Sequence, residues 1–209
     1  TGNVGRKTLE VLKKKGLTLG NLYLVASSKS AGKKIHFQGK DIVVSELENF
    51  DFSKVKIAFF AAGGKISEKF AEKAAKHCLV IDNSSFFRMD PDVPLIVPQV
   101  NSDALNNIKK NIIANPNCST AQLVIALKPL HDLFVIKRIV VSTYQSVSGA
   151  GKASMDELIK QTKLALEGKD IKSENFEGLK IKQLGDDISS IIEKNFKNLL
   201  NNFQNQNNQ

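Results

Sequence analysis

The sequence predicts an α/β fold built on a largely parallel β-sheet, and two observations lead to this prediction. Apolar runs of strand length alternate with segments of helical periodicity over about the first 170 of the 209 residues. Small polar residues or glycines close three of the runs, in "ASSKSAG", "AAGG" and "NPNC". Because ligands of such sheets bind beyond the carboxyl ends of the strands, these three ends are where we expect chemistry.

The expected elements follow in order along the chain. The opening "TGNVGRKTLEVLKKKG" has Val4, Leu9 and Leu12 at helical spacing and predicts a helix that ends near Gly16. Further helices are expected at 67–77, with Ser67 as N-cap, at 119–132 and at 153–168, with Gly168 as the stop. Strands are expected at 21–27, 54–64, 79–84, 111–115 and 136–145. From Asn175 onward there is no strand signal, and the final "NNFQNQNNQ" has low complexity.

Composition excludes several classes of protein. Two cysteines cannot form a disulfide framework and no CxxC pair indicates zinc, so we expect no metal and a reducing, cytoplasmic location. No apolar run reaches the roughly 18 residues of a membrane span, and no signal peptide is evident. The net charge is +9, but the basic residues are dispersed and only "KKK" at 13–15 forms a run. We therefore expect a solvated basic surface and no nucleic-acid partner.

The helix-opening "TGNVG" is half of a dinucleotide-binding fingerprint. Glycines let backbone N–H groups approach a pyrophosphate, whose charge the helix N-terminus favours. The strand and first glycine that usually precede it are absent from the sequence, so an ordinary glycine turn is the alternative. After the next strand, Ser27, Ser28, Lys29 and Ser30 stand where an NAD site usually has an acidic residue. Hydroxyls and a cation suit a 2′-phosphate, which favours NADP over NAD, with a polar turn as the alternative.

The two cysteines differ in their surroundings. Cys118 stands where a strand turns into a helix, in "NIIANPNCSTAQLVIALKPL". A helix N-terminus stabilises a thiolate, and the same N–H groups can stabilise an oxyanion on an attacked carbonyl. Burial in the core is the alternative, since free cysteine is among the most buried residue types. Cys78 leads into an apolar strand in "KHCLVID", and we expect it to be a core residue.

Several stretches together carry a resemblance to one enzyme family. "TGNVG", "ASSKSAGK", "FFAAGG", "VIDNSSFFRMDPDVPLIVPQVN", "KKNIIANPNCST" and "STYQSVSGAGKASMDEL" occur in this order. Over about residues 1–170 the chain resembles the aspartate-semialdehyde dehydrogenases. The nucleophile motifs of acetylglutamyl-phosphate reductases and glyceraldehyde-phosphate dehydrogenases do not match "NPNCST".

The resemblance implies a Rossmann-like parallel sheet, here lacking its first strand, and the beginning of an α+β catalytic and dimerisation domain. The expected domains are an NADP-binding domain at 1–117, the start of the catalytic domain at 118–172, and a divergent helical to disordered tail at 173–209.

The same resemblance implies an activity: NADPH-dependent conversion of aspartyl β-phosphate to aspartate semialdehyde and phosphate, in lysine, diaminopimelate, threonine and methionine synthesis. The implied partners are these small molecules and, for the intact family member, a second copy of the chain, with no nucleic acid and no membrane. Cys118 would attack the acyl phosphate and form a thioester, Arg88 would hold the phosphate, and Asn117 and Gln145 would bind the substrate. The implied cofactor-binding residues are Thr1, Gly2, Asn3, Val4, Lys29, Ser30, Ser148 and Gly149, although family members commonly have arginine at the position of Lys29.

From the residues alone, the planar guanidinium of Arg88 could bind a phosphate or form a surface ion pair with the carboxylates of "RMDPD". Gln145 could equally be a polar residue at the end of a strand. The family also needs an acid–base histidine and a carboxylate-binding arginine well after the glutamine. The histidines of this sequence, His36, His77 and His131, all precede Gln145. Along one helix, His131 would lie roughly 20 Å from Cys118. The alternatives are therefore a non-catalytic remnant or an unfolded gene product, and we expect little or no turnover from this polypeptide alone.

Overall fold

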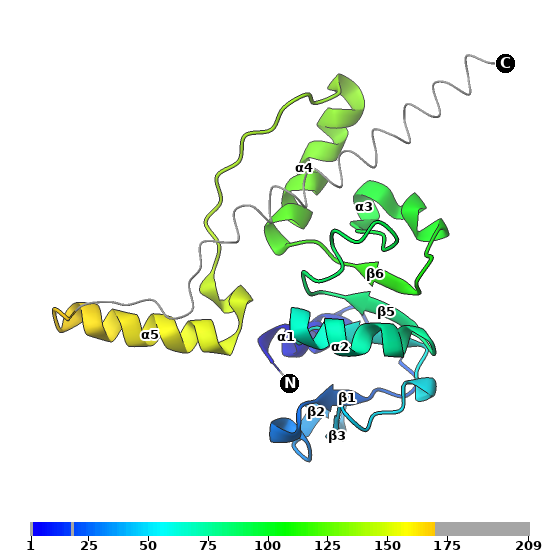
Figure 1. Ribbon diagram of the computed structural model, residues 1–209, viewed down its shortest axis with the longest axis vertical. Coiled ribbons are helices and arrows are strands. Elements are labelled where there is room, and N and C mark those ends of the chain that lie inside the picture. Colours follow the sequence, from blue (N-terminus) through cyan, green and yellow to red (C-terminus); the bar gives the residue numbers. More distant parts are fainter. Residues whose placement is uncertain (1, 18, 170–209) are drawn as a thin grey trace. The chain divides into compact units, whose positions relative to one another are not determined.

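The computed structural model describes residues 2–169 except residue 18, and these residues divide into two compact units (Figure 1). The first unit holds residues 2–55 and 144–169, and the second holds residues 56–143. Thr1 and the tail predicted at 173–209 lie outside the described residues. The mixed α/β architecture with parallel strand pairs is the fold class that the sequence predicts.

A mixed three-stranded sheet organises the first unit. Strand β1 (Leu24–Ala26) runs parallel to β3 (Lys40–Glu46), which pairs antiparallel with β2 (Lys34–Phe37). The β2–β3 hairpin turns at Gln38 and Gly39, whose φ values are 48° and 81°. Positive φ at both central residues is what the favoured two-residue hairpin turn requires. The sequence pattern predicts β1 but misses this hairpin, because charged side chains occupy most outward positions of its short strands.

The first unit also contains two α-helices, one before its strands in the sequence and one in its second segment. Helix α1 (Asn3–Lys14) and helix α5 (Lys152–Leu166) confirm two of the predicted helices. Short 3-10 turns follow β1 at Ser28–Ser30 and precede α5 at Val147–Ala150. The side-chain amide of Asn3 donates to the Met155 sulfur at 3.3 Å and so joins α1 to α5.

The second unit is built on a parallel sheet in the order β4-β5-β6. Its strands are β4 (Ile57–Phe60), β5 (Leu79–Asp82) and β6 (Ile112–Ala114). Leu95 forms a further parallel bridge to Ala114, so β6 pairs with β5 on one side and with Leu95 on the other. All three strands lie within predicted ranges, and their carboxyl ends meet at one edge of the sheet, where ligands of α/β folds bind.

Helix α2 (Gly64–Ala75) packs against this sheet (Figure 1). Its N-cap is Gly63, at φ 92°, rather than the predicted Ser67. Ser67 is fully buried one turn further on, and its hydroxyl donates to Asp82 at 2.7 Å. The helix begins earlier than predicted because glycine adopts positive φ without strain and so can serve as the N-cap.

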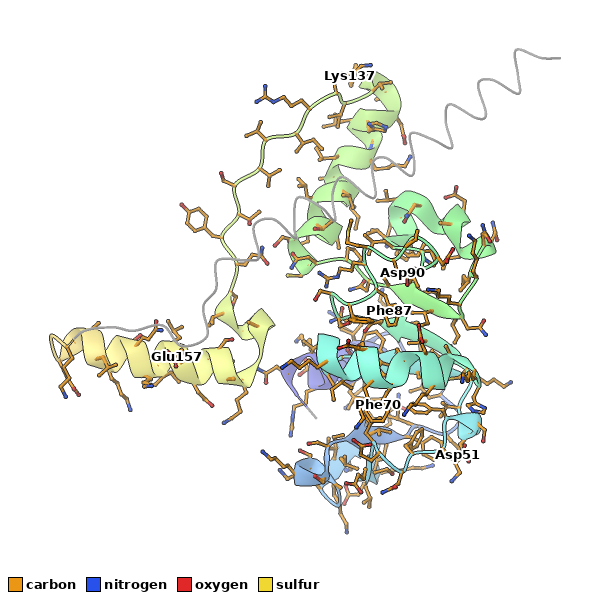
Figure 2. All side chains as sticks on the ribbon, viewed as in Figure 1. Asp51, Phe70, Phe87, Asp90, Lys137 and Glu157 are labelled. Atoms are coloured by element: carbon orange, nitrogen blue, oxygen red, sulfur yellow. The ribbon has the colours of Figure 1, made fainter. Side chains whose placement is uncertain are left out.

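The short helix α3 (Pro98–Asn101) precedes β6 in the sequence, and helix α4 (Cys118–Phe134) follows β6. Phe70 of α2 is 4% exposed and Phe87 of the loop after β5 is 2% exposed (Figure 2). Their burial, with that of the strand side chains, gives this unit an apolar core. Its other members include Val80, Val93, Leu95, Ile112, Ala114 and Val124.

The strand predicted at 136–145 is wrong. This segment has no regular structure and carries exposed side chains, with Val140 80% exposed, in the extended stretch around Lys137 (Figure 2). A strand needs a neighbour to take its backbone hydrogen bonds. Among the described residues, none pairs with this apolar run.

No helix within the described part of the chain is both long and apolar enough to cross a membrane.

Candidate active site

Cys118 is the first residue of α4 and its side chain is exposed. Asn117 precedes it as N-cap, with extended backbone (φ −57°, ψ 146°), and its side-chain oxygen accepts the Ser119 N–H at 3.0 Å. The Cys118 sulfur lies 3.9 Å from that same oxygen. Burial in the core, the alternative for this cysteine, is therefore excluded. The unpaired N–H groups of the first turn of α4 point out of the N-terminal end of the helix, where Cys118 lies, and they favour negative charge there.

The three residues before Cys118 form a fixed approach to the helix. Pro116 is fully buried and has a restricted φ. Asn115 takes part in four hydrogen bonds. Its N–H donates to the Asp82 carbonyl at 2.8 Å, and its carbonyl accepts from Nε of Arg88 at 3.0 Å. Its side-chain Nδ2 donates to Oδ1 of Asn83 at 2.6 Å and to the Pro116 carbonyl at 3.2 Å.

Arg88 lies in the loop after β5 and is only 7% exposed, so its side chain is buried rather than at the surface. Besides the bond to Asn115, its Nη2 lies 3.5 Å from the Asn83 carbonyl. The structure thus brings Arg88 against the loop that leads into Cys118. A guanidinium held by backbone carbonyls keeps a fixed orientation, as recognition of a phosphate group requires.

The loop that carries Arg88 is held by a buried aspartate. Asp82 is fully buried at the end of β5, and its carboxylate accepts three hydrogen bonds. The donors are the Ser67 hydroxyl at 2.7 Å, the Ser84 N–H at 3.0 Å and the Ser84 hydroxyl at 2.7 Å. Asp82 therefore ties the loop to α2 as well as to its own strand.

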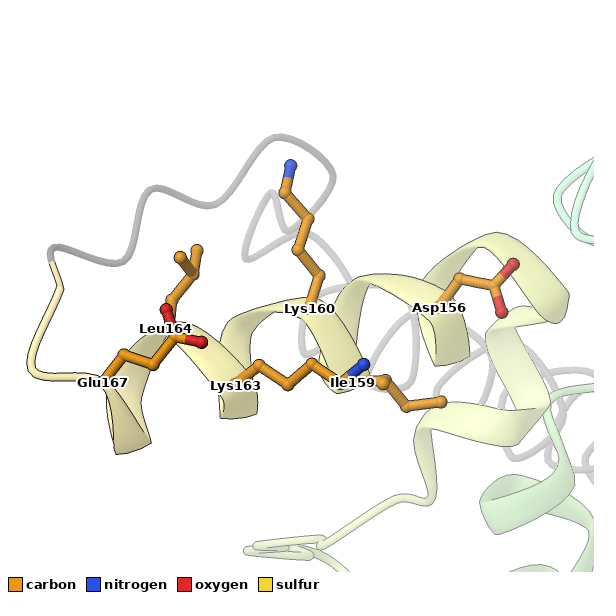
Figure 3. Close-up of a pocket in the computed structure, with 6 residues that line it drawn as sticks. All are labelled: Asp156, Ile159, Lys160, Lys163, Leu164 and Glu167. Carbon is orange, nitrogen blue, oxygen red and sulfur yellow. The ribbon is translucent and has the colours of Figure 1, made fainter.

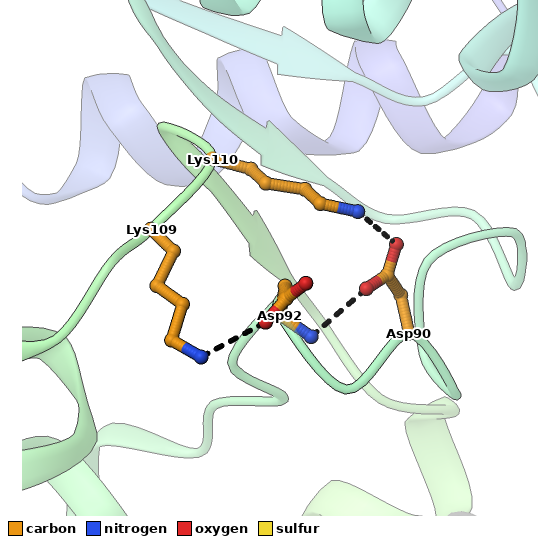
Figure 4. Close-up of polar contacts among 4 residues, drawn as sticks. All are labelled: Asp90, Asp92, Lys109 and Lys110. Atoms are coloured by element: carbon orange, nitrogen blue, oxygen red, sulfur yellow. Dashed lines mark hydrogen bonds and ion pairs between the residues drawn. The ribbon is translucent and has the colours of Figure 1, made fainter.

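Two ion pairs connect the later part of the same loop, at Asp90 and Asp92, to the lysines before β6 (Figure 4). Lys110 pairs with Asp90 at 2.8 Å, and Lys109 pairs with Asp92 at 2.9 Å. The hydrogen bond to Asp90 raises the pKa of Lys110 above its usual range. The carboxylates of "RMDPD" thus bind the lysines that precede β6.

Cys78 behaves as the sequence predicts. It is 6% exposed, its thiol donates to the Ala74 carbonyl at 3.3 Å, and burial raises its pKa. A buried, protonated thiol is a poor nucleophile, so Cys78 serves packing.

The proposed cofactor residues lie in the first unit. Gly2, with extended backbone at φ −74° and ψ 177°, caps α1, and Asn3 and Val4 begin the helix, whose first turn has no acidic residue. Lys29 is exposed and Ser30 half-buried in the turn after β1. A helix N-terminus with a glycine before it and a cationic, hydroxyl-rich turn both favour negatively charged groups such as the phosphates of a dinucleotide.

Gln145, Ser148 and Gly149 also belong to the first unit, and all three are exposed. The hydroxyls of Ser146 and Ser148 are 2.7 Å apart, and the Gly149 N–H donates to the Ser146 carbonyl at 3.3 Å. The loop before α5 is therefore folded locally. Cys118, Asn117 and Arg88 belong to the second unit, so the structure gathers the predicted residues into two separate groups.

A hollow of about 460 Å³ lies along α5 (Figure 3). It contains none of the predicted site residues, and side chains of one helix line it: Asp156, Ile159, Lys160, Lys163, Leu164 and Glu167. Its charged side chains are of both signs, as on an ordinary solvated surface, and it adds nothing to the site.

Sequence reasoning missed the residues that join Arg88 to the cysteine loop, namely Asp82, Asn83 and Asn115. The available signal was "IDNSS", a fourth strand end that is rich in polar residues. Parallel pairing of β5 with β6 places that end beside "NPNC", which the order of the sequence alone does not specify.

Comparison with known proteins identifies the family. The model described as semialdehyde dehydrogenase, NAD binding domain, matches residues 1–108, and the model for the dimerisation domain matches residues 127–201. The second match extends beyond residue 170, where the resemblance in motifs ends. Aspartate-semialdehyde dehydrogenase of Rickettsia bellii is 52% identical over 165 residues, which cover 78% of this chain and 49% of the relative. Aspartate-semialdehyde dehydrogenase 2 of Vibrio cholerae is 52% identical over 170 residues, or 80% and 50% of the two chains.

Solved structures agree. Aspartate semialdehyde dehydrogenase II of Vibrio cholerae, complexed with ASA, matches with a TM-score of 0.78 and 50% identity, over 85% of this chain and 53% of that one. The Candida albicans enzyme, solved with NADP, matches with a TM-score of 0.52 and 30% identity, over 65% and 46%. The chain spans about half the length of the curated relatives it matches. With a family model covering more than half of its residues and relatives of this identity, the chain belongs to the aspartate-semialdehyde dehydrogenase family.

Proposed function

We propose that this protein takes part in the NADP-dependent interconversion of aspartyl β-phosphate and aspartate semialdehyde, with Cys118 as the nucleophile. The observation that carries the proposal is the exposed thiol at the first turn of α4, on a loop hydrogen-bonded to the buried Arg88. The names of the relatives support the same chemistry. The pathways that would use the product are those of lysine, diaminopimelate, threonine and methionine.

The Cys118 sulfur would attack the acyl carbon of the substrate as a thiolate, forming a thioester as the bond to the phosphate oxygen breaks. The N–H groups of the first turn of α4 would stabilise the oxyanion of the tetrahedral intermediate. Arg88 would hold the phosphate before and after its release, because a planar guanidinium can donate two parallel hydrogen bonds to it. Asn117 and Gln145 would orient the acyl group and the amine of the substrate.

The cofactor would bind to the first unit. The N–H groups at the start of α1, around Gly2, Asn3 and Val4, would donate hydrogen bonds to the pyrophosphate, and Lys29 with Ser30 would contact the 2′-phosphate. Thr1, Ser148 and Gly149 complete the proposed set. When bound, NADPH supplies the hydride that reduces the thioester. We infer NADP rather than NAD from Lys29 and the absence of an acidic residue at Ser27–Ser30, and the Candida albicans enzyme solved with NADP supports this choice.

A second candidate is a non-catalytic remnant of the enzyme, and the positions of the histidines favour it for the 209-residue polypeptide by itself. His131 is the histidine on α4, thirteen residues after Cys118 and therefore roughly 20 Å along the helix. General acid–base help is typically worth about 10²–10⁴-fold in rate. We propose that thioester formation by this polypeptide is separable from rapid turnover.

We further propose a cytoplasmic homodimer, with the boundary between cofactor-binding and catalytic domains at 117/118 and the start of the catalytic domain at 118–172. The match to a dimerisation domain supports the dimer, and the two family matches, which end at 108 and begin at 127, support the boundary.

The test is phosphate-dependent reduction of NADP with aspartate semialdehyde, measured for the polypeptide and for Cys118→Ala. Turnover that disappears in Cys118→Ala supports the enzyme. Equal, negligible rates for both proteins support the remnant, whereas turnover that survives in Cys118→Ala contradicts the role of this thiol.

A further inference from the structure

The carboxyl ends of β5 and β6 are joined by a side-chain bridge that the proposed mechanism does not use. Nδ2 of Asn115 donates to Oδ1 of Asn83 at 2.6 Å. Both side chains are half-buried, and each asparagine directly follows the last residue of its strand. The bridge therefore links the loop that carries Arg88 to the loop that carries Cys118.

Arg88 uses the same two residues as supports. Its Nε donates to the carbonyl of Asn115 at 3.0 Å, and its Nη2 lies 3.5 Å from the carbonyl of Asn83. The orientation of the guanidinium consequently depends on the separation of the two asparagine backbones. The pairing of β5 with β6 sets the separation at the strand ends, and the Asn83–Asn115 bridge holds it one residue beyond them.

The path from Asn115 to Cys118 is short and stiff. Pro116 is fully buried, and the Asn117 side chain caps α4 through the Ser119 N–H. Buried proline allows little rotation about its backbone, so a shift at Asn115 is passed on to the first turn of the helix.

We propose that Asn115, through its bridge to Asn83, is a positioning residue that fixes the Cys118 thiol relative to the Arg88 guanidinium. The inference rests on the proposed function in that it takes Cys118 and Arg88 as the reacting pair. A simpler possibility is that the bridge only stabilises two loops. The two ideas differ in what they predict for the chemistry at the sulfur once stability is accounted for.

The experiment compares two alkylating agents of similar size and different charge. Iodoacetate is an anion that a nearby guanidinium attracts, whereas iodoacetamide is neutral. The ratio of their rate constants at Cys118, followed by mass spectrometry of its peptide, reports how well the positive charge faces the thiolate. The ratio is independent of turnover. Because unfolded chains react with a ratio of their own, each variant is measured under conditions in which circular dichroism shows it to be folded.

The matched control is Asn101→Ala. Asn101 is also an asparagine of the second unit, and its buried side chain accepts from the Val97 N–H and donates to the Leu95 carbonyl, both at 2.8 Å. It thus loses a similar set of hydrogen bonds in the same unit, and neither of these bonds involves Asn83, Arg88 or residues 115–118. Asn83→Gln serves as the rescue variant, since it keeps a neutral amide oxygen that can accept from Asn115.

We expect Asn115→Ala, Asn115→Ser and Asn83→Ala each to lower the iodoacetate-to-iodoacetamide ratio about three- to tenfold, the scale of losing a nearby unit charge at partial exposure. The double variant Asn83→Ala/Asn115→Ala should fall no further, while Asn101→Ala and Asn83→Gln should keep the ratio within about twofold. An unchanged ratio in Asn115→Ala and Asn115→Ser, an equal fall in Asn101→Ala, or a ratio insensitive to Arg88→Lys and Arg88→Met would overturn the inference.

The outcome is distinct from that of the proposed function. A ratio that depends on Asn115 in a protein that forms no thioester supports the positioning role and contradicts the enzyme. A thioester that forms normally while the ratio ignores Asn115 does the reverse.

Discussion

Replacing Asp82 by alanine should cost the second unit a large part of its stability. The carboxylate is fully buried and accepts from the Ser67 hydroxyl, the Ser84 N–H and the Ser84 hydroxyl. Alanine leaves these donors without their acceptor, and an unsatisfied buried donor costs about 1–3 kcal/mol. Removal of a buried charge offsets part of the loss. We therefore expect a net decrease of about 2–5 kcal/mol in the free energy of unfolding, against a typical total of about 5–15 kcal/mol.

The assay is urea denaturation followed by circular dichroism, with the exposed Asp103→Ala as control, which should stay within about 0.5 kcal/mol of the parent. A double-variant cycle with Ser67→Ala isolates the bond to α2. If the two single effects couple, the double variant should lose less than their sum. A loss below about 1 kcal/mol in Asp82→Ala, or strict additivity with Ser67→Ala, would refute the reasoning that this carboxylate holds the loop to α2.

Three further predictions concern the cofactor, the thiols and pH. NADPH should bind more tightly than NADH in a fluorescence titration, and Lys29→Glu should weaken NADPH about tenfold because a carboxylate repels the 2′-phosphate; equal affinities would contradict the choice of cofactor. Limiting iodoacetamide should label Cys118 before Cys78, whose pKa burial raises; preferential labelling of Cys78 would reverse the assignment. Because the pKa of Lys110 is raised in the folded state, its stabilising contribution is fully present below the unfolded value of roughly 10.4 and is lost as pH rises through the folded value. The difference in stability between the parent and Lys110→Met should therefore shrink above about pH 10.5, and a constant difference would count against the ion pair with Asp90.

Local patterns predicted most of the second unit. Buried parallel strands read as short apolar runs, so "KVKIAFFAAGG" and "KHCLVID" identified β4 and β5, and Asn117 before an apolar helical stretch identified the start of α4. The failures arose where structure depends on neighbours. The apolar run at 136–145 has strand composition, yet without a pairing partner among the described residues it forms no strand.

The candidate site was predictable in its residue types but not in its connections. Cys118 can be singled out from the sequence because it lies at a strand–helix junction. Arg88 can be singled out separately because a guanidinium is suited to binding phosphate. That Arg88 is buried, and that Asn115 supports it, follows only from the adjacent pairing of β5 and β6, a contact between residues 27 positions apart. The family match in turn names a reaction that neither the junction nor the fork specifies.

The most direct test of the account is the mass of the protein after brief incubation with aspartyl β-phosphate in the absence of NADPH, with quenching in acid. The account predicts one aspartyl group on Cys118, located by peptide mapping, absent from Cys118→Ala and removed by hydroxylamine as a thioester. An adduct on Cys78, an adduct that persists in Cys118→Ala, or no adduct on a folded protein would contradict it.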